Sequence, residues 1–161
     1  MTAPKQLVKF IVALLVCFGA SGFGAIFMTQ DSIDNWYAQL QKPSFTPPDW
    51  VFGPAWIILY LLMAISVFLV WKKGMDYPKV KQSLGLFLVQ LALNSIWTPL
   101  FFGFHLILSA FIEIIILWFA ILATMLAFKR ISLSASILLI PYLIWVGFAT
   151  ILNGSIWYLN R

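Results

Sequence analysis

The sequence is poor in the residues that most metal, disulfide and hydrolytic chemistry requires. Its 161 residues include one cysteine, Cys17, one histidine, His105, and only five acidic residues. A single cysteine excludes an internal disulfide and a paired-cysteine zinc site. No glycine loop of the kind that cradles phosphate is present, and His105 has no acid partner nearby in sequence. We therefore expect no metal site, and leave open whether the chain is an enzyme.

Charge is scarce as well. Charged residues make up 9% of the chain and hydrophobic residues 63%, whereas soluble domains average about 25% charged and about 45–50% apolar residues. A core of this size cannot hide that much apolar surface, so lipid must be the solvent. The net charge of +5 comes from short basic clusters between apolar segments. Membrane topology explains such clusters better than nucleic-acid binding does, and we expect no nucleic-acid partner.

No linker, low-complexity run or internal repeat divides the chain, so we expect a single domain over residues 1–161. A transmembrane helix needs about 20 apolar residues. Five segments qualify, and together they predict an all-α membrane protein, a five-transmembrane-helix bundle: 6–28, 51–71, 81–102, 106–128 and 133–158. Proline lacks the backbone donor of a helix interior, so we expect a break at Pro99 and a kink at Pro141.

The basic residues predict the orientation. With five spans, eight of them fall on one side of the membrane: Lys5, Lys9, Lys72, Lys73, Lys79, Lys81, Lys129 and Arg130. Lys and Arg mark the cytoplasmic face, so the N-terminus is predicted to be cytoplasmic and the C-terminus outside. The absence of a transit-peptide-like presequence favours a bacterial plasma membrane. A cleaved signal peptide is the alternative for the first segment, but its apolar stretch continues to Met28, longer than the usual 7–15 residues.

The first connection, residues 29–50, is long, and long loops are commonly functional or disordered. Disordered segments are poor in aromatic residues, whereas this loop contains Trp36, Tyr37, Phe45 and Trp50. We therefore expect a folded lid. Trp and Tyr also concentrate at membrane interfaces, so an interfacial aromatic belt remains the alternative for these residues.

Motifs spread along the chain make the sequence recognisable. They are Trp36-Tyr37, Leu40-Gln41-Lys42-Pro43, Pro47-Pro48, Trp50, Gly53-Pro54, Trp56 and Leu59-Tyr60, then Asn94, Trp97, Pro99 and Phe101-Phe102-Gly103, and finally Pro141-Tyr142, Trp145, Phe148-Ala149, Leu152-Asn153 and Trp157. In these motifs the sequence resembles the translocator protein family, also called tryptophan-rich sensory proteins or TspO. Phe45 and Ser109 depart from it, because relatives carry tryptophan at these positions.

The resemblance implies a five-helix bundle, commonly a homodimer, that binds porphyrins such as protoporphyrin IX and needs no cofactor. Transport, stress sensing and light-dependent porphyrin breakdown have all been proposed for the family. We expect a membrane porphyrin-binding sensor or scavenger, with light-dependent degradation at Trp56 and Trp145 as a further activity that the resemblance implies. The alternative is a transporter of porphyrins or other amphiphilic ligands, although five helices without a repeat do not resemble an alternating-access carrier.

A porphyrin is a flat apolar disc with two propionates, and its site needs aromatic walls, small residues, a few polar groups and a cationic rim. We expect that site beneath the first loop, between the first, second, third and fifth spans. The candidate ligand-binding residues are Trp36, Lys42, Trp50, Phe52, Trp56, Gln90, Asn94, Trp97, Trp145, Ala149, Leu152 and Asn153. For each one the alternative is structural, because aromatic stripes pack and membrane amides join helices.

Three further features carry separate expectations. The small residues of the first span favour close helix packing or dimer contact over ligand contact. Glu113 is the only acid deep in an apolar segment; such residues are often functional, but one isolated carboxyl is a poor proton relay, and its role stays open. With one histidine, a haem held by two axial histidines is excluded, so an iron-free porphyrin fits better.

Overall fold

The computed structural model describes residues 3–161, with side chains from residue 4 onward. Six α-helices follow one another, and none of the described residues forms a strand: α1 (Ala3–Ala25), α2 (Phe52–Trp71), α3 (Pro78–Thr98), α4 (Ile107–Lys129), α5 (Leu133–Leu138) and α6 (Ile140–Leu159). Three short turns join them: η1 (Ser32–Tyr37) and η3 (Pro99–Gly103), both π-helical, and the 3₁₀ turn η2 (Asp49–Val51).

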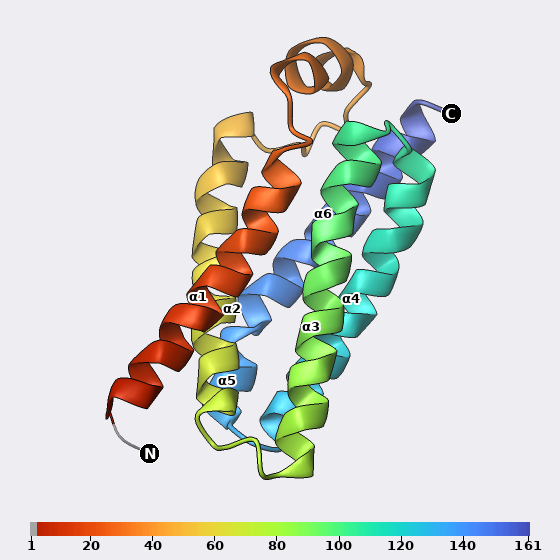
Figure 1. Cartoon of the computed structure of the whole chain (residues 1–161). Helices are drawn as coiled ribbons and strands as arrows, with labels where there is room; N and C mark the ends of the chain where they lie inside the picture. The colour runs from red at the N-terminus through yellow and green to blue at the C-terminus, as the bar shows by residue number, and fades with distance from the viewer. Residues whose placement is uncertain (1–2) are drawn as a thin grey trace.

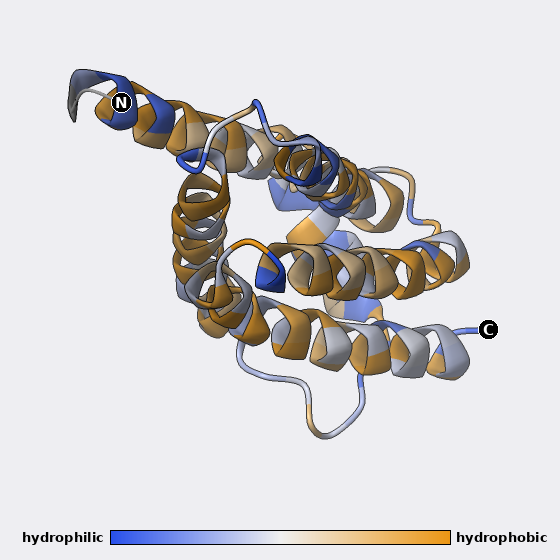
Figure 2. Cartoon of the chain, turned by 90° about the horizontal axis from the view of Figure 1, so that it is seen from below, coloured by the Kyte–Doolittle hydropathy of each residue, from blue (hydrophilic) through white to orange (hydrophobic). Residues whose placement is uncertain are grey.

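The helices run side by side along one axis, with the two ends of the chain at opposite ends of the bundle (Figure 1). Five helical segments are long and apolar enough to cross a membrane, with α5 and α6 together making the fifth. Orange, the colour of apolar residues, covers most of the length of the helices (Figure 2). Leu15, Ile144 and Ile151 are each more than 60% exposed, which suits contact with acyl chains. The expected five-span, all-helical membrane fold is confirmed.

The two prolines act differently from a simple break and kink. At Pro99 the α-helix passes directly into the π-helical turn η3, whose wider ring is closed by a hydrogen bond from Phe104 N to Pro99 O, 2.8 Å long. The fifth span is two helices, because α5 ends at Leu138 and α6 starts at Ile140. Pro141 therefore lies in the first turn of α6, where a missing N–H costs no hydrogen bond. The first helix also ends at Ala25, three residues before the predicted end.

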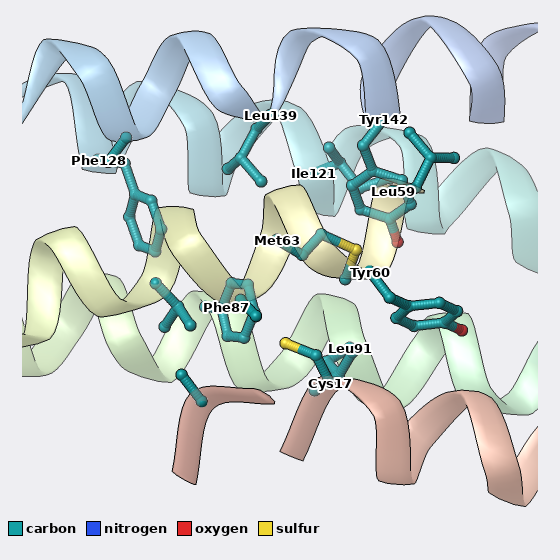
Figure 3. Packing of buried hydrophobic residues seen from close by; sticks show 14 of the residues in the cluster. Cys17, Leu59, Tyr60, Met63, Phe87, Leu91, Ile121, Phe128, Leu139 and Tyr142 are labelled. Carbon is teal, nitrogen blue, oxygen red and sulfur yellow. The ribbon is translucent and has the colours of Figure 1, made fainter. Parts of the chain in front are cut away.

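The half of the bundle distant from the first loop contains a close-packed core (Figure 3). Met63, Phe87, Ile121 and Phe128 are each no more than 1% exposed. Phe87 and Phe128 stack with ring centroids 6.0 Å apart. Two serine hydroxyls that would otherwise be unsatisfied in this apolar interior donate to backbone carbonyls, Ser66 to Ala135 O and Ser136 to Met125 O.

The first loop is structured, as expected, and covers the other end of the bundle (the orange segment in Figure 1). Trp36 of η1 stacks on His105, with ring centroids 4.1 Å apart and the planes 12° from parallel. Further along, Asn160 Nδ2 donates to Gln41 O while Asn160 Oδ1 accepts from Gln41 N, both at 2.9 Å. The loop is thus tied at one point to the α3–α4 turn and at another to the end of the chain.

Candidate ligand cavity

A cavity of about 440 Å³ lies between the helices beneath the first loop. Ligand sites in proteins commonly range from about 300 to 1,000 Å³. Residues from all five spans line it, together with Ile33 and Tyr37 of η1 above. The cavity therefore occupies the half of the bundle that the close-packed core leaves free.

Three indoles wall the cavity from three helices: Trp56 of α2, Trp97 of α3 and Trp145 of α6. Phe52 meets Trp145 edge to face, with ring centroids 5.8 Å apart, and Trp97 stacks on Phe101 at 5.0 Å. Aromatic pairs favour these offset and edge-on arrangements, which hold the rings in fixed orientations. The walls are consequently flat, apolar and polarisable.

On one side of the cavity an asparagine amide joins three helices. The Trp97 indole N–H donates to Asn153 Oδ1 at 3.0 Å, and Asn153 Nδ2 donates to Ile107 O at 3.1 Å. Asn153 is 2% exposed, and both groups of its amide are satisfied. Asn153 therefore links helices, as the structural alternative predicts, and also lines the cavity.

A second polar chain forms the floor. The Tyr60 hydroxyl donates to Asn94 Oδ1, Asn94 Nδ2 donates to the Tyr142 hydroxyl at 2.9 Å, and that hydroxyl donates to Gln90 Oε1 at 3.0 Å. Tyr60 and Asn94 line the cavity, whereas Tyr142 and Gln90 lie beneath it, fully buried. The chain links α2, α3 and α6 at the level where the cavity ends and the core begins.

Trp56 and Trp145 differ from Trp97 in their polar atom. Neither indole N–H has a hydrogen-bond acceptor among residues 3–161, although both rings line the cavity. An indole N–H in an apolar site usually finds a partner. These two donors are therefore available to a molecule in the cavity.

The roof contains one buried phenol. Tyr37 lines the cavity, and burial, with a smaller contribution from the Asp49 carboxylate, raises the pKa of Tyr37 to about 12. The phenol is thus neutral at physiological pH. Lys42 places its ammonium 4.1 Å from the centroid of this ring, a cation–π contact. Lys42 itself does not line the cavity.

Of the twelve predicted ligand-binding residues, the structure brings eight together on the cavity: Phe52, Trp56, Asn94, Trp97, Trp145, Ala149, Leu152 and Asn153. Four lie elsewhere. Gln90 is below the floor, Lys42 contacts Tyr37 from outside, and Trp36 stacks on His105. Trp50 is 75% exposed, as the interfacial-belt alternative predicts. Trp36 belongs to η1, which places its indole against the α3–α4 turn, and Trp50 belongs to η2, which leaves its indole exposed. Gln90 lies on α3 one helical turn further from the lid than Asn94.

Two groups of lining residues were not among those predicted to bind the ligand. Ala20, Ser21 and Gly24 of α1 line the cavity, although packing alone was favoured for that stripe. Packing is also real, because a Cβ at Gly24 would lie 3.2 Å from the Thr98 hydroxyl. Helix α4, not expected at the site, contributes Ile114 and Leu117. Tyr60 could have been found, since it follows Trp56 by four residues on one helical face.

Glu113 does not line the cavity. Its side chain is 8% exposed, and neither carboxyl oxygen has a hydrogen-bond partner among the described residues. Within the same residues no group of three His, Cys, Asp or Glu side chains is arranged to hold a metal ion. The cavity that the described residues enclose has aromatic walls and few polar groups.

Fold and cavity define a class: an all-helical, multi-pass membrane protein with a structured extramembrane loop over an aromatic cavity of small-molecule size. The sequence profile of the TspO/MBR family matches residues 11–159, and the chain belongs to that family. It is 42% identical over 155 residues to a tryptophan-rich protein TspO of Chlorobaculum tepidum, covering 94% of this chain and 98% of the relative.

Two further relatives carry other names. The chain is 45% identical over 128 residues to the translocator protein of Homo sapiens, covering 79% of this chain and 76% of the relative. It is 36% identical over 151 residues to a tryptophan-rich sensory protein of Cereibacter sphaeroides, covering 94% and 90%. The resemblance noted in the sequence is therefore confirmed over nearly the whole chain.

Proposed function

We propose that this protein binds a porphyrin, with protoporphyrin IX as the expected ligand, in the cavity beneath the first loop. The observation that carries the proposal is the pair of indoles, Trp56 and Trp145, which face one cavity with their N–H donors unused. Flat aromatic walls favour a flat polarisable ligand by stacking. Two free donors favour a ligand with acceptors, such as pyrrole nitrogens or propionate oxygens.

The composition of the rest of the cavity supports an iron-free ring. His105, the one histidine of the sequence, stacks on Trp36 and does not line the cavity, so the commonest axial ligand of a haem iron is missing from its walls. Ala149 and Gly24 are small, so a flat ligand can approach the helix backbone at these two positions. No cofactor is needed for binding of this kind, and the porphyrin is treated as ligand.

As a biological role we propose sensing or scavenging of porphyrin, with light-dependent degradation as an additional activity. An illuminated porphyrin converts dioxygen to reactive species, and Trp56 and Trp145 are the indoles with free N–H groups on the cavity. Oxidation would then require light, porphyrin and dioxygen together. These indoles are therefore the residues that we propose for the photochemistry.

The test is a titration of detergent-purified protein with protoporphyrin IX, followed by tryptophan fluorescence in the dark and then under light. We expect saturable quenching that weakens in Trp56→Phe and Trp145→Phe. Trp118, whose indole contacts Gly147 outside the cavity, provides a matched control as Trp118→Phe. Quenching that does not saturate would reject porphyrin binding. A porphyrin band that persists in light with dioxygen present would reject degradation while leaving binding intact.

The transporter alternative has one observation in its favour, which is that a relative at 45% identity is named a translocator protein. Against it, the cavity is closed towards the other side by the Tyr60–Asn94–Tyr142 floor and the core below. A carrier must open its site to each side in turn. Porphyrin uptake into proteoliposomes, compared with binding to the same protein in detergent, separates transport from binding.

Orientation, membrane and assembly complete the proposal. The starts of α1 and α3 and the ends of α2 and α4 share one end of the bundle, and eight of the ten Lys and Arg residues lie there or in the adjoining turns. We propose that this end is cytoplasmic, in a plasma membrane, with the lid outside. The homodimer remains a proposal from the family resemblance, to be tested by light scattering of the protein–detergent complex.

A further inference from the structure

The residues that line the cavity differ in exposure according to the helix that provides them. Every lining residue of α3, α4 and α6 is buried or half-buried. The exposed lining residues come only from α1, from α2 and from the loop residues that adjoin these two helices: Ala25, Met28, Asp49, Gly53 and Ile57. The cavity therefore reaches the molecular surface between these two helices.

The register of the two helices shows which residues face one another there. Phe10 contacts Phe68 with ring centroids 5.3 Å apart, and eight residues later Phe18 contacts Tyr60, eight residues earlier on α2, at 6.1 Å. The helices are thus antiparallel neighbours in constant register. Continuing this register outward sets Ser21 opposite Ile57 and Ala25 opposite Gly53.

Side-chain size changes along this seam. Aromatic rings fill the space between α1 and α2 from Phe10 to the Phe18–Tyr60 contact. Between that contact and the lid the facing residues are small: Ser21, Ala25 and Gly53. A Cβ placed on Gly53 would meet no heavy atom within 4 Å. Outward of the Phe18–Tyr60 level, no ring contact joins α1 to α2 among the described residues. The seam is consequently a slot that continues the cavity sideways.

The slot opens towards lipid. Ile57 is 60% exposed and Met28 43% exposed, and Ile57 lies within a membrane-spanning segment, Asp49–Trp71. Exposed apolar side chains on such a segment contact acyl chains. The one charged residue on the cavity is Asp49, at the outer end of that segment. A ligand reaching the slot would therefore come from the bilayer.

The route from above is closed by contrast. The lid is held by the Trp36–His105 stack and by the paired hydrogen bonds of Asn160 with Gln41. Tyr37, 9% exposed, lies between the lid surface and the cavity. Passage through the roof would require these contacts to separate, whereas no hydrogen bond or ring contact among the described residues joins Ser21 or Ala25 to Gly53 or Ile57 across the slot.

We propose that the outer halves of α1 and α2 form a lateral portal, through which an amphiphile dissolved in the bilayer reaches the cavity without opening of the lid. The statement that porphyrin uses this portal rests on the proposed porphyrin-binding function. Flat apolar ligands partition into lipid, so the portal draws on a ligand concentration far above that in water. The lid then acts as a fixed roof, and exchange is controlled by the slot.

The first test measures exchange rates of protoporphyrin IX with protein in lipid nanodiscs. Gly53→Phe adds a ring at the slot, at a position where a Cβ would meet no heavy atom within 4 Å. Gly22→Phe is its control, because Gly22 is also an exposed helical glycine with open space at its Cβ position but does not line the cavity. We expect Gly53→Phe to slow association and dissociation by a common factor of about ten, equivalent to about 1.4 kcal/mol in the barrier. Gly22→Phe should leave both rates unchanged. Slower dissociation alone, or faster exchange in Asn160→Ala, overturns the portal.

The second test does not depend on porphyrin. A fatty acid carrying a nitroxide on its acyl chain is added to the nanodiscs, and quenching of the Trp56 contribution is obtained as the difference between the parent protein and Trp56→Phe. We expect this quenching to fall severalfold in Gly53→Phe and to persist in Gly22→Phe. Equal quenching in both glycine variants overturns the portal. Quenching that follows the expected pattern without any porphyrin binding would retain the portal and reject porphyrin as the ligand.

Discussion

The two halves of the bundle contain similar residues but use them differently. In the half distant from the lid, Phe87, Phe128 and Met63 interlock and leave almost no exposed surface. In the half beneath the lid, Trp56 and Trp145 leave a cavity between them and keep two polar atoms unused. Aromatic content alone therefore does not distinguish a core from a site; free donors and unfilled volume do.

The largest loss of stability is expected for a substitution in the close-packed half of the bundle. Phe87→Ala should destabilise the protein by about 3–5 kcal/mol, because it leaves a large cavity where the ring stacks on Phe128. Thermal unfolding in detergent measures this. Leu88→Ala, on an exposed position of the same helix, is the control and should change stability little. Equal melting temperatures for the two variants would contradict the assignment of this half as the core.

The boundary between the halves should respond next. Asn94→Leu removes the group that joins the hydroxyls of Tyr60 and Tyr142, leaving buried polar atoms unsatisfied at about 1–3 kcal/mol. We expect lower thermal stability together with weaker ligand binding, since the floor is shared. Ser95→Ala, which removes a hydroxyl that donates to Leu91 O within α3 and does not line the cavity, should leave the ligand affinity unchanged. A loss of stability with ligand binding intact would mean that the floor serves the core alone.

Substitution of the site indoles should separate binding from stability. Trp145→Phe keeps an aromatic ring against Phe52 but deletes the free N–H, so we expect protoporphyrin IX affinity to fall about tenfold, near 1.4 kcal/mol. Thermal stability without ligand should change by much less. If the melting temperature falls as far as in Phe87→Ala, the outer half packs as tightly as the inner half and the contrast between them fails.

The lid should show the smallest effects. Because Tyr37 has a pKa raised above the ordinary value for tyrosine, its neutral form stabilises the docked lid below about pH 10, and this stabilisation is lost as pH rises towards 12. We expect a late tyrosinate absorbance step that is absent in Tyr37→Phe. Tyr158, which is exposed, gives the comparison as Tyr158→Phe. A step for Tyr37 at the ordinary tyrosine pKa would indicate that the lid does not bury the phenol.

The sequence allowed the spans to be predicted because each one is a long apolar run. It allowed eight cavity residues to be predicted because the indoles and amides recur at helical spacing. It could not reveal that Pro141 begins a separate helix, since a proline in an apolar run is compatible with a kink or with a first turn. It also could not separate Trp50 from Trp56: both are indoles near one helix end, and only the 3₁₀ turn between Asp49 and Val51 sends one outward.

The first span also could not be interpreted fully from its sequence. Ala20, Ser21 and Gly24 form a small-residue stripe, and such a stripe has the same sequence pattern whether it packs against a helix or borders a cavity. Gly24 does both, with Thr98 close by and the cavity beside it. The distinction depends on how far α2 lies from α1 at that level, which is a property of the tertiary arrangement.

The paired hydrogen bonds between Gln41 and Asn160 also bear on how the molecule is made. Gln41 leaves the ribosome early, whereas its partner Asn160 caps the end of α6, so the roof can be completed only after α6 has been made and inserted. Until then the half-built bundle is open at the top.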